Sequence, residues 1–173
     1  MKSLVRQAQR GDDQAFVELI EENKQTMYKV AVGILRNDSD AADAIQESIL
    51  TCYERMTELK KPQYFKTWLS RILINVANDY LRNKGMVDLE LDETSYVKEV
   101  VIEDKIEIKI DLYNAIDELE DKYKDAVILR YIDDLKIEDI SKILDRPVNT
   151  IKTHLRKALK DMKKMLKEGY FNE

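Results

Sequence analysis

The sequence contains few of the residues that interrupt helices: only four of its 173 residues are glycine and two are proline. This composition is poor in the turns that β-sandwiches and β-barrels require, and 36% of the residues are charged. At about 150 residues per domain, the length allows one ordinary domain or two small ones and excludes a large catalytic barrel. We therefore predict an all-α protein.

Cysteines and long apolar runs are also scarce. The single cysteine, Cys52, cannot form an internal disulfide. Residues 1–15 lack the apolar run of a secretory signal, and no stretch approaches the roughly 18 consecutive apolar residues of a membrane span. We expect a cytoplasmic protein with no direct membrane insertion.

The side chains that build active sites are sparse. His154 is the only histidine, and no cysteine or carboxylate lies near it at metal-ligand spacing, so we expect it to face DNA or solvent. Cys52 lies among apolar neighbours, and the four glycines are too scattered for a phosphate-binding loop. The acids at 133–134 and 138–139 read as turn and first-turn residues rather than a metal pair. The sequence thus predicts no enzyme, no metal and no cofactor.

The net charge of −5 conceals an alternating pattern. Residues 38–58 hold six acids and one base, whereas residues 60–84 hold six bases and one acid. Residues 88–111 hold nine acids and three lysines, and residues 142–167 hold nine bases and two acids. Two basic blocks separated by an acidic one indicate two polyanion-binding surfaces, although solvated helix faces would give the same pattern.

Apolar spacing of three and four predicts three helices in the N-terminal half. The first opens at residues 11–13 and runs to Leu35, and the second follows the break at 37–40, where Ser39 or Asp40 can cap it. The third runs over 64–83 and ends at Gly85. Its expected core face comprises Phe65, Trp68, Leu69, Ile72, Val76, Tyr80 and Leu81.

Periodicity is lost from residue 86 to about 101, which indicates an exposed linker. A helix should begin near 104, two short helices should cover 126–132 and 137–144, and a last helix should cover 149–167. We therefore expect two small helical domains, residues 1–85 and 104–173, joined by a flexible acidic linker at 86–103.

The short helix at 137–144, the turn at 145–147 and the basic helix after it have the spacing of a helix-turn-helix. Asn149, Thr150 and Thr153 fall in the first turn, where recognition helices reach base edges. Later cations would meet phosphates: Lys152, Arg156, Lys160, Lys163 and Lys167. An ordinary helical hairpin with a solvated basic face is the alternative.

The helix at 64–83 carries a second candidate surface. Arg71, Asn75, Asn78 and Arg82 share one face, and aromatic residues cluster at its start beside Lys60, Lys61 and Lys66. Cations that follow a backbone and aromatics that stack on bases favour single-stranded DNA. Trp68 alone fits a core position better.

Six stretches, in this order, resemble the conserved segments of extracytoplasmic-function sigma factors of bacterial RNA polymerase. They are GDDQAF at 11–16, DAADAIQES at 40–48, FKTWLSRI at 65–72, NDYLR at 78–82, and LRY at 129–131 followed by RPVNTIKT at 146–153. The resemblance covers nearly all of the chain outside the linker. It implies a σ2 and a σ4 domain that act with core polymerase to recognise and open promoters.

The resemblance also implies site residues. Asp43, Gln46 and Glu47 would dock on the clamp helices of the polymerase large subunit. The minus-10 element would be melted and read by Phe65, Asn75, Asn78 and Arg82, to which the shared helix face adds Arg71. The minus-35 element would be read by Arg146, Asn149, Thr150, Lys152, Thr153 and Arg156, with Lys157 beside them. An anti-sigma factor is a further implied partner.

The sequence departs from the family pattern at three positions. Asp145 replaces the usual turn glycine, Asn149 replaces a common glycine, and His154 stands where arginine is frequent. These departures concern the minus-35 preference rather than the fold. A dimeric helix-turn-helix regulator and a helical adaptor are the rival interpretations. The first leaves the N-terminal half unexplained, and the second leaves both basic faces unused.

Overall fold

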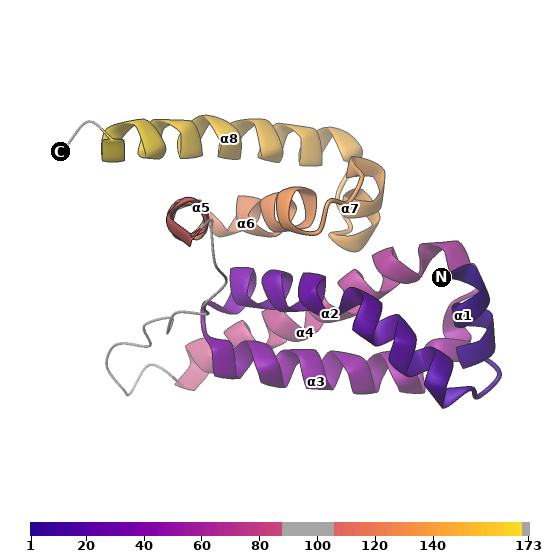
Figure 1. Cartoon of the computed structure of the whole chain (residues 1–173). Helices are drawn as coiled ribbons and strands as arrows, with labels where there is room; N and C mark the ends of the chain where they lie inside the picture. The colour runs from indigo at the N-terminus through magenta and orange to yellow at the C-terminus, as the bar shows by residue number, and fades with distance from the viewer. Residues whose placement is uncertain (88–105, 171–173) are drawn as a thin grey trace. The chain divides into compact units, whose positions relative to one another are not determined.

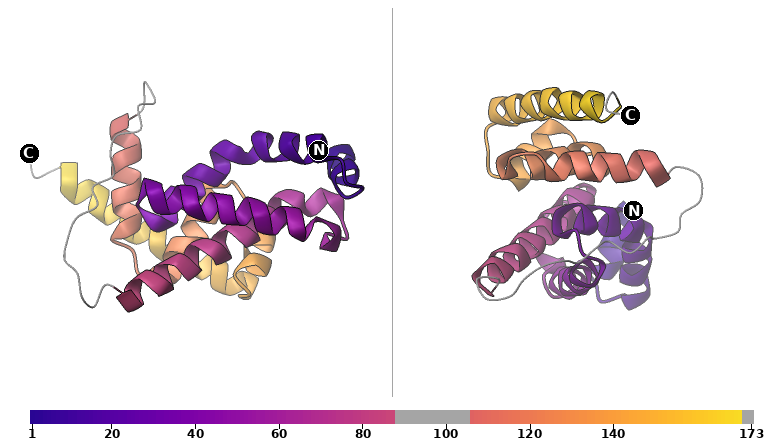
Figure 2. Two further views of the ribbon diagram at one scale, coloured as in Figure 1. Left: turned by 90° about the horizontal axis from the view of Figure 1, so that it is seen from below. Right: turned by 90° about the vertical axis from the view of Figure 1, so that its left-hand side faces the viewer.

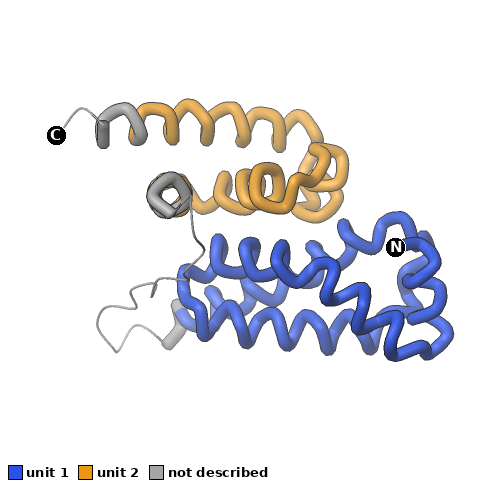
Figure 3. Tube along the Cα trace, in the orientation of Figure 1, with its two compact units in different colours: residues 1–97 blue, residues 98–173 orange. Residues whose placement is uncertain are grey.

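The computed structural model describes residues 1–87 and 106–170, and their side chains over 1–84 and 112–165. Every regular element in these ranges is a helix, which confirms the all-α prediction. The chain divides into two compact units, Met1–Val97 and Lys98–Glu173 (Figure 3). The predicted linker, residues 86–103, lies outside the described residues except for its first two positions, which belong to a helix.

Unit 1 is a helical bundle (Figure 1). Its elements are α1 (Lys2–Ala8), α2 (Asp13–Leu35), α3 (Asp38–Glu54), the 3₁₀ turns η1 (Met56–Glu58) and η2 (Pro62–Tyr64), and α4 (Phe65–Val87). The helices α2, α3 and α4 pack against one another, and α1 packs on α2 and η2. Large apolar side chains of α1, α2 and α4 are fully or almost fully buried, among them Val5, Leu19, Val30, Phe65 and Leu73.

Local chemistry places the helix boundaries of unit 1. Asp12 caps α2, because its carboxylate accepts a hydrogen bond from the backbone N–H of Ala15 at 3.1 Å. Asn37 caps α3 through the N–H of Asp40 at 2.9 Å, so the expected caps Ser39 and Asp40 are wrong. Those two residues instead belong to the first turn of α3.

Two further boundaries differ from expectation. The helix α1 was not predicted, since a seven-residue amphipathic segment gives a weak periodic signal. The helix α4 continues through Gly85 to Val87, because one interior glycine costs a helix only about 1 kcal/mol. Leu81 was assigned to the core face of α4, yet 42% of it is exposed.

Unit 2 comprises α5 (Ile106–Asp117), α6 (Asp121–Val127), the π-helical turn η3 (Ile128–Ile132), α7 (Ile137–Ile143) and α8 (Val148–Tyr170). The long helix α8 lies across α5, α6 and α7 (Figure 2). The single short helix expected at 126–132 is thus an α-helix that begins earlier and ends in a π-helical turn. No helix of the described residues is long and apolar enough to cross a membrane.

Helix α7 is followed by a residue in the left-handed conformation, at the start of the connection to α8. Asp145 has a φ of 49°, and the N–H of Arg146 donates to the carbonyl of Ser141 at 3.0 Å. This is the Schellman pattern, in which glycine is the preferred left-handed residue. The hydroxyl of Ser141 also donates to the carbonyl of Arg146 at 2.6 Å. The turn therefore keeps the geometry that a glycine would favour while carrying an aspartate.

Candidate protein and nucleic-acid interfaces

The outer face of α3 carries an acidic surface. Asp43, Gln46 and Glu47 are all exposed. The opposite face is buried at Ala41, Ala44, Ser48 and Cys52, where small side chains allow close packing on α2 and α4. Because the buried face fixes the orientation of α3, the two carboxylates and the amide are held outward together.

The acids of α3 lie beside the last turns of α4. Burial, followed by the charges of Glu47, Asp43 and Asp40, raises the pKa of the Tyr80 phenol. Further along, the Lys84 ammonium lies 2.9 Å from a carboxylate oxygen of Asp40. The acidic surface of α3 and the polar side of α4 are therefore neighbours within one unit.

The predicted minus-10 residues of α4 fall on its solvent side, with one exception. Arg71, Asn75 and Arg82 are exposed, and Asn78 is half-buried. Arg82 forms an ion pair with Asp79, one turn earlier in the same helix. Such an exposed pair stabilises little and is easily exchanged for another anion.

The position of Phe65 does not fit the stacking role expected for it. Its ring is fully buried, with the centroid 6.3 Å from that of Trp68, which is itself half-buried. A ring in that position packs the start of α4 into the core and presents no face to a base. The exposed aromatic residue beside it is Tyr64 in η2, 43% of which is accessible.

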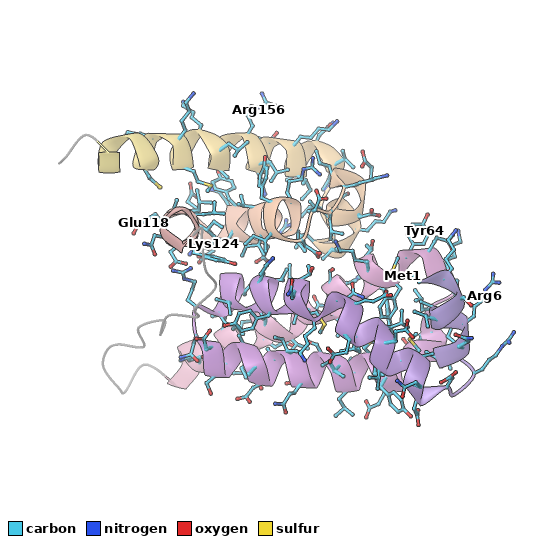
Figure 4. All side chains as sticks on the ribbon, viewed as in Figure 1. Met1, Arg6, Tyr64, Glu118, Lys124 and Arg156 are labelled. Atoms are coloured by element: carbon cyan, nitrogen blue, oxygen red, sulfur yellow. The ribbon has the colours of Figure 1, made fainter. Side chains whose placement is uncertain are left out.

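The predicted minus-35 residues form one exposed surface on the start of α8 and the turn before it. Arg146, Asn149, Lys152, Thr153, Arg156 and Lys157 are exposed, and Thr150 is half-buried. Ile151, Leu155, Ala158 and Met162 are buried on the other side. Figure 4 shows Arg156 pointing away from the other helices of its unit. Leu159, expected on the apolar side, is 45% exposed.

The expected environment of His154 is also wrong. It was expected to face DNA or solvent, but it is half-buried, and its ring meets that of Tyr123 edge-on with centroids 5.1 Å apart. Burial lowers the pKa of the imidazole, as do the nearby charges of Arg146, Lys122 and Lys157, while a backbone hydrogen bond at Lys122 opposes them. His154 thus belongs to the contact between α6 and α8.

The thiol and the acids fit structural roles. Cys52 is buried, and burial raises the pKa of its thiol to about 12. The predicted turn acids Asp133 and Asp134 follow η3, with Asp134 in a left-handed conformation at a φ of 55°. Within the two described ranges, no group of three or more His, Cys, Asp or Glu side chains is placed to hold a metal ion.

Sequence reasoning missed one exposed group of cations. Lys2 and Arg6 lie four residues apart on α1, and Arg10 follows in the turn after it. All three are exposed. Their spacing of four was a usable signal, but no helix was predicted there to give that spacing a meaning.

Two family models match the chain, one on each unit. The model "Sigma-70 region 2" matches residues 19–86, and the model "Sigma-70, region 4" matches residues 109–162. The first range contains the acidic face of α3 and the polar face of α4. The second contains α7 and α8 up to residue 162, which is the segment predicted to form a helix-turn-helix.

Curated relatives and solved structures agree with these matches. The chain is 37% identical to RNA polymerase sigma factor SigV of Bacillus subtilis strain 168, over 85% of this chain and 88% of that protein. It is 29% identical to ECF RNA polymerase sigma factor SigW of the same strain, over 97% of both chains. Its fold resembles that of the sigma factor RpoE of Bartonella quintana, at a TM-score of 0.75 and 18% identity over 87% of this chain and 97% of that one.

A second solved structure, CnrH bound to the cytosolic domain of CnrY, has a TM-score of 0.74 at 16% identity, over 96% of this chain and 97% of that one. The two family models match in the expected order, and a relative is 37% identical, so the family of the chain is shown. The chain belongs to the extracytoplasmic-function group of sigma-70 factors, the alternative initiation factors that direct promoter recognition by RNA polymerase.

Proposed function

We propose that the acidic surface of α3, formed by Asp43, Gln46 and Glu47, docks the chain on a basic helical surface of core RNA polymerase. The supporting observation is the geometry of α3: its three polar side chains are exposed together while the opposite face is locked in the core. Two carboxylates on a rigid helix suit a cationic partner, since charge complementarity directs the encounter and fixes its register.

The two basic surfaces then contact promoter DNA in different states. On α4, Arg71, Asn75, Asn78 and Arg82 meet the melted minus-10 element, where amides can reach base edges and guanidinium groups can hold phosphates. Phe65 supports this surface from the core rather than by stacking. On unit 2, the start of α8 enters the major groove of duplex DNA at the minus-35 element.

The residues for that groove are divided by position. Asn149, Thr150 and Thr153 lie in the first turns of α8, nearest the base edges, although the Thr153 hydroxyl already donates to the Asn149 carbonyl at 2.9 Å. Arg146, Lys152, Arg156 and Lys157 supply positive charge on the same exposed surface. A bidentate arginine contact to guanine is the commonest specific contact of this kind.

An anti-sigma factor is a further proposed partner. The RpoE structure that this fold resembles was solved in complex with the anti-sigma factor NepR. Such a protein would bind the free chain and compete with core polymerase for it. We also propose that the chain acts in the cytoplasm, where it would meet core polymerase and promoter DNA.

We propose that residues 86–103 link the two domains, residues 1–85 and 104–173. Limited proteolysis of the free chain should therefore cut first inside 86–103 and release two helical fragments. First cleavage within α4 before residue 84, or within α8, would contradict the proposed boundaries.

In vitro transcription tests the central proposal. Purified chain added to core polymerase should produce run-off transcripts from a subset of a promoter panel, and core polymerase alone should not. A steep decrease of promoter affinity with salt should accompany it, because basic surfaces release counterions from phosphates. A chain that binds DNA as a dimer without core polymerase would instead favour the helix-turn-helix regulator.

A further inference from the structure

Ser141, near the end of α7, has no role in the function proposed above, yet its hydroxyl bonds outside its own helix. The hydroxyls of Ser48, Ser70 and Thr153 each donate to the carbonyl four residues earlier in the same helix. That is the ordinary bond of a helical serine or threonine. The Ser141 hydroxyl instead donates forward, to the carbonyl of Arg146 at 2.6 Å. Because Arg146 is a proposed minus-35 residue, this bond joins α7 to the DNA surface.

Both backbone polar groups of Arg146 are bonded to this one serine. The Arg146 N–H donates to the Ser141 carbonyl at 3.0 Å, and the Arg146 carbonyl accepts from the Ser141 hydroxyl. Pro147 follows, and a residue before proline is confined largely to extended backbone conformations. The carbonyl of Pro147 then accepts from the N–H of Ile151 at 3.1 Å, in the first turn of α8. The backbone of Arg146 is therefore fixed from both sides.

The turn contains a strained residue that these bonds enclose. Asp145 has a φ of 49°, a left-handed conformation that is unfavourable for a residue with a Cβ. Strained backbone persists only where the surrounding structure holds it in place. The two bonds between Ser141 and Arg146 span Asp145 and close the turn around it. The hydroxyl of Ser141 therefore supplies one of the contacts that hold this turn.

The side chain of Arg146 acts on its neighbours although it is exposed. Burial is the largest cause of the lowered pKa of the His154 imidazole, and the charge of Arg146 is the next. The charges of Lys122 and Lys157 lower this pKa by less. The guanidinium of Arg146 therefore lies within electrostatic range of the second turn of α8, and the pKa of His154 reports where it is.

We propose that Ser141 is a positioning residue for minus-35 recognition, which holds Arg146 at the start of the recognition helix in the conformation that contacts promoter DNA. This inference rests on the proposed function. Ser141 acts through the backbone of Arg146 and needs no contact of its own with DNA. Because ordering a flexible segment on binding costs affinity, a turn already held in its bound conformation binds more tightly.

The single histidine of the chain allows a direct test. In the untagged full chain all imidazole signals come from His154, and an NMR titration gives its pKa. Ser141→Ala should raise this pKa toward its value in Arg146→Ala, because a mobile guanidinium spends less time near the imidazole. Ser141→Thr, which keeps a hydroxyl, should stay near the wild type. Ile143→Val, which removes one buried methyl group from α7, lowers stability alone and should leave the pKa of His154 unchanged.

Promoter affinity tests the consequence for DNA. Each variant is assembled with core polymerase, and its affinity for a fluorescent duplex promoter is measured. Ser141→Ala should bind on the order of fivefold more weakly, the loss typical of one hydrogen bond, and Ser141→Thr should bind like the wild type. Added to Arg146→Ala, the change Ser141→Ala should weaken binding no further. Added to Arg156→Ala, it should weaken binding by the same factor again.

Three results would overturn the inference. An unchanged pKa of His154 in Ser141→Ala would mean that the hydroxyl does not hold the Arg146 side chain. Equal losses of promoter affinity in Ser141→Ala and Ile143→Val would make Ser141 a general stabilising residue. Additive losses in the double variant of Ser141 and Arg146 would mean that Ser141 acts elsewhere. Unchanged promoter affinity in Arg146→Ala would instead refute the proposed minus-35 role of Arg146, and that variant alone would reveal it.

Discussion

The imidazole of His154 packs edge-on against the ring of Tyr123 and so ties α8, the proposed recognition helix, to α6. The ring centroids are 5.1 Å apart. His154 lies between Thr153 and Leu155, the first an exposed residue of the DNA surface and the second a buried residue of the core. The histidine thus belongs to the packing of α8 on α6.

The contact makes unit 2 sensitive to acid. Because the folded state lowers the pKa of His154, the unfolded chain binds the proton more readily between that lowered value and the ordinary value near 6.5. Stability from this residue is therefore complete above about pH 6.5 and falls as the pH decreases through that window. Thermal unfolding of the wild type and of His154→Phe, which keeps a ring, should be compared at pH 7.5 and 5.5. On acidification, the melting temperature of the wild type should decrease more than that of the variant. Equal decreases would contradict the lowered pKa of His154.

Reversal of charge on α3 should weaken docking to core polymerase. The pair Gln46→Ala with Glu47→Lys replaces two exposed side chains and should reduce the affinity about tenfold or more, because a basic partner would meet a like charge. The matched control is Gln25→Ala with Glu22→Lys, on an exposed part of α2. Fluorescence titration of labelled chain with core polymerase measures both affinities. An equal affinity for the two variants, with helicity intact by circular dichroism, would refute the docking surface.

The two DNA surfaces should fail in different assays. Arg156→Ala should lower affinity for duplex promoter by about 1–3 kcal/mol if the guanidinium contacts a base edge, and a pre-melted minus-10 region should not restore it. Asn75→Ala should instead reduce permanganate reactivity of the minus-10 element. Lys136→Ala, an exposed cation before α7, is the control for lost charge. A loss of duplex binding in Asn75→Ala, with none in Arg156→Ala, would show that the two surfaces have been interchanged.

Glycine at position 145, the left-handed residue between α7 and α8, should stabilise unit 2. Asp145→Gly relieves the φ of 49°, whereas Asp145→Ala keeps a Cβ and loses the carboxylate that helps aspartate to tolerate this region. We expect the glycine variant to be more stable than the alanine variant by about 1 kcal/mol. Urea unfolding of the three proteins measures the order. A more stable alanine variant would mean that the turn changes conformation on substitution.

The helices were predictable where periodicity was long. The segments of α2, α3, α4 and α8 repeat apolar residues over four or more turns, and their positions were found to within a few residues. The sequence alone could not decide between local signals that compete for the same helix boundary. Asn37, Ser39 and Asp40 are all good caps, and only the extended backbone of Asn37 selects the one that is used.

The surfaces were predictable by charge and spacing, and the errors lie at aromatic residues. An apolar ring beside cations fits both a stacking platform and a core anchor. Phe65 was expected in both roles, and its burial fits only the core position, whereas its exposed neighbour Tyr64 was not among the predicted site residues. His154 failed for a similar reason. Its place in the basic helix, with no metal-ligand partner nearby, suggested DNA or solvent, and its contact with Tyr123 depends on how α6 crosses α8.

The burial of Cys52 has a practical consequence for spectroscopy. The chain has one thiol, fully buried and with a pKa raised to about 12, so almost none of it is thiolate at neutral pH. Maleimide dyes should therefore ignore the wild-type protein and react with cysteines introduced at exposed positions such as Ser3 and Lys160. A donor and an acceptor dye on those two sites, one in each unit, would report the distance between the units by energy transfer. The measurement could follow the chain as it passes from solution onto polymerase.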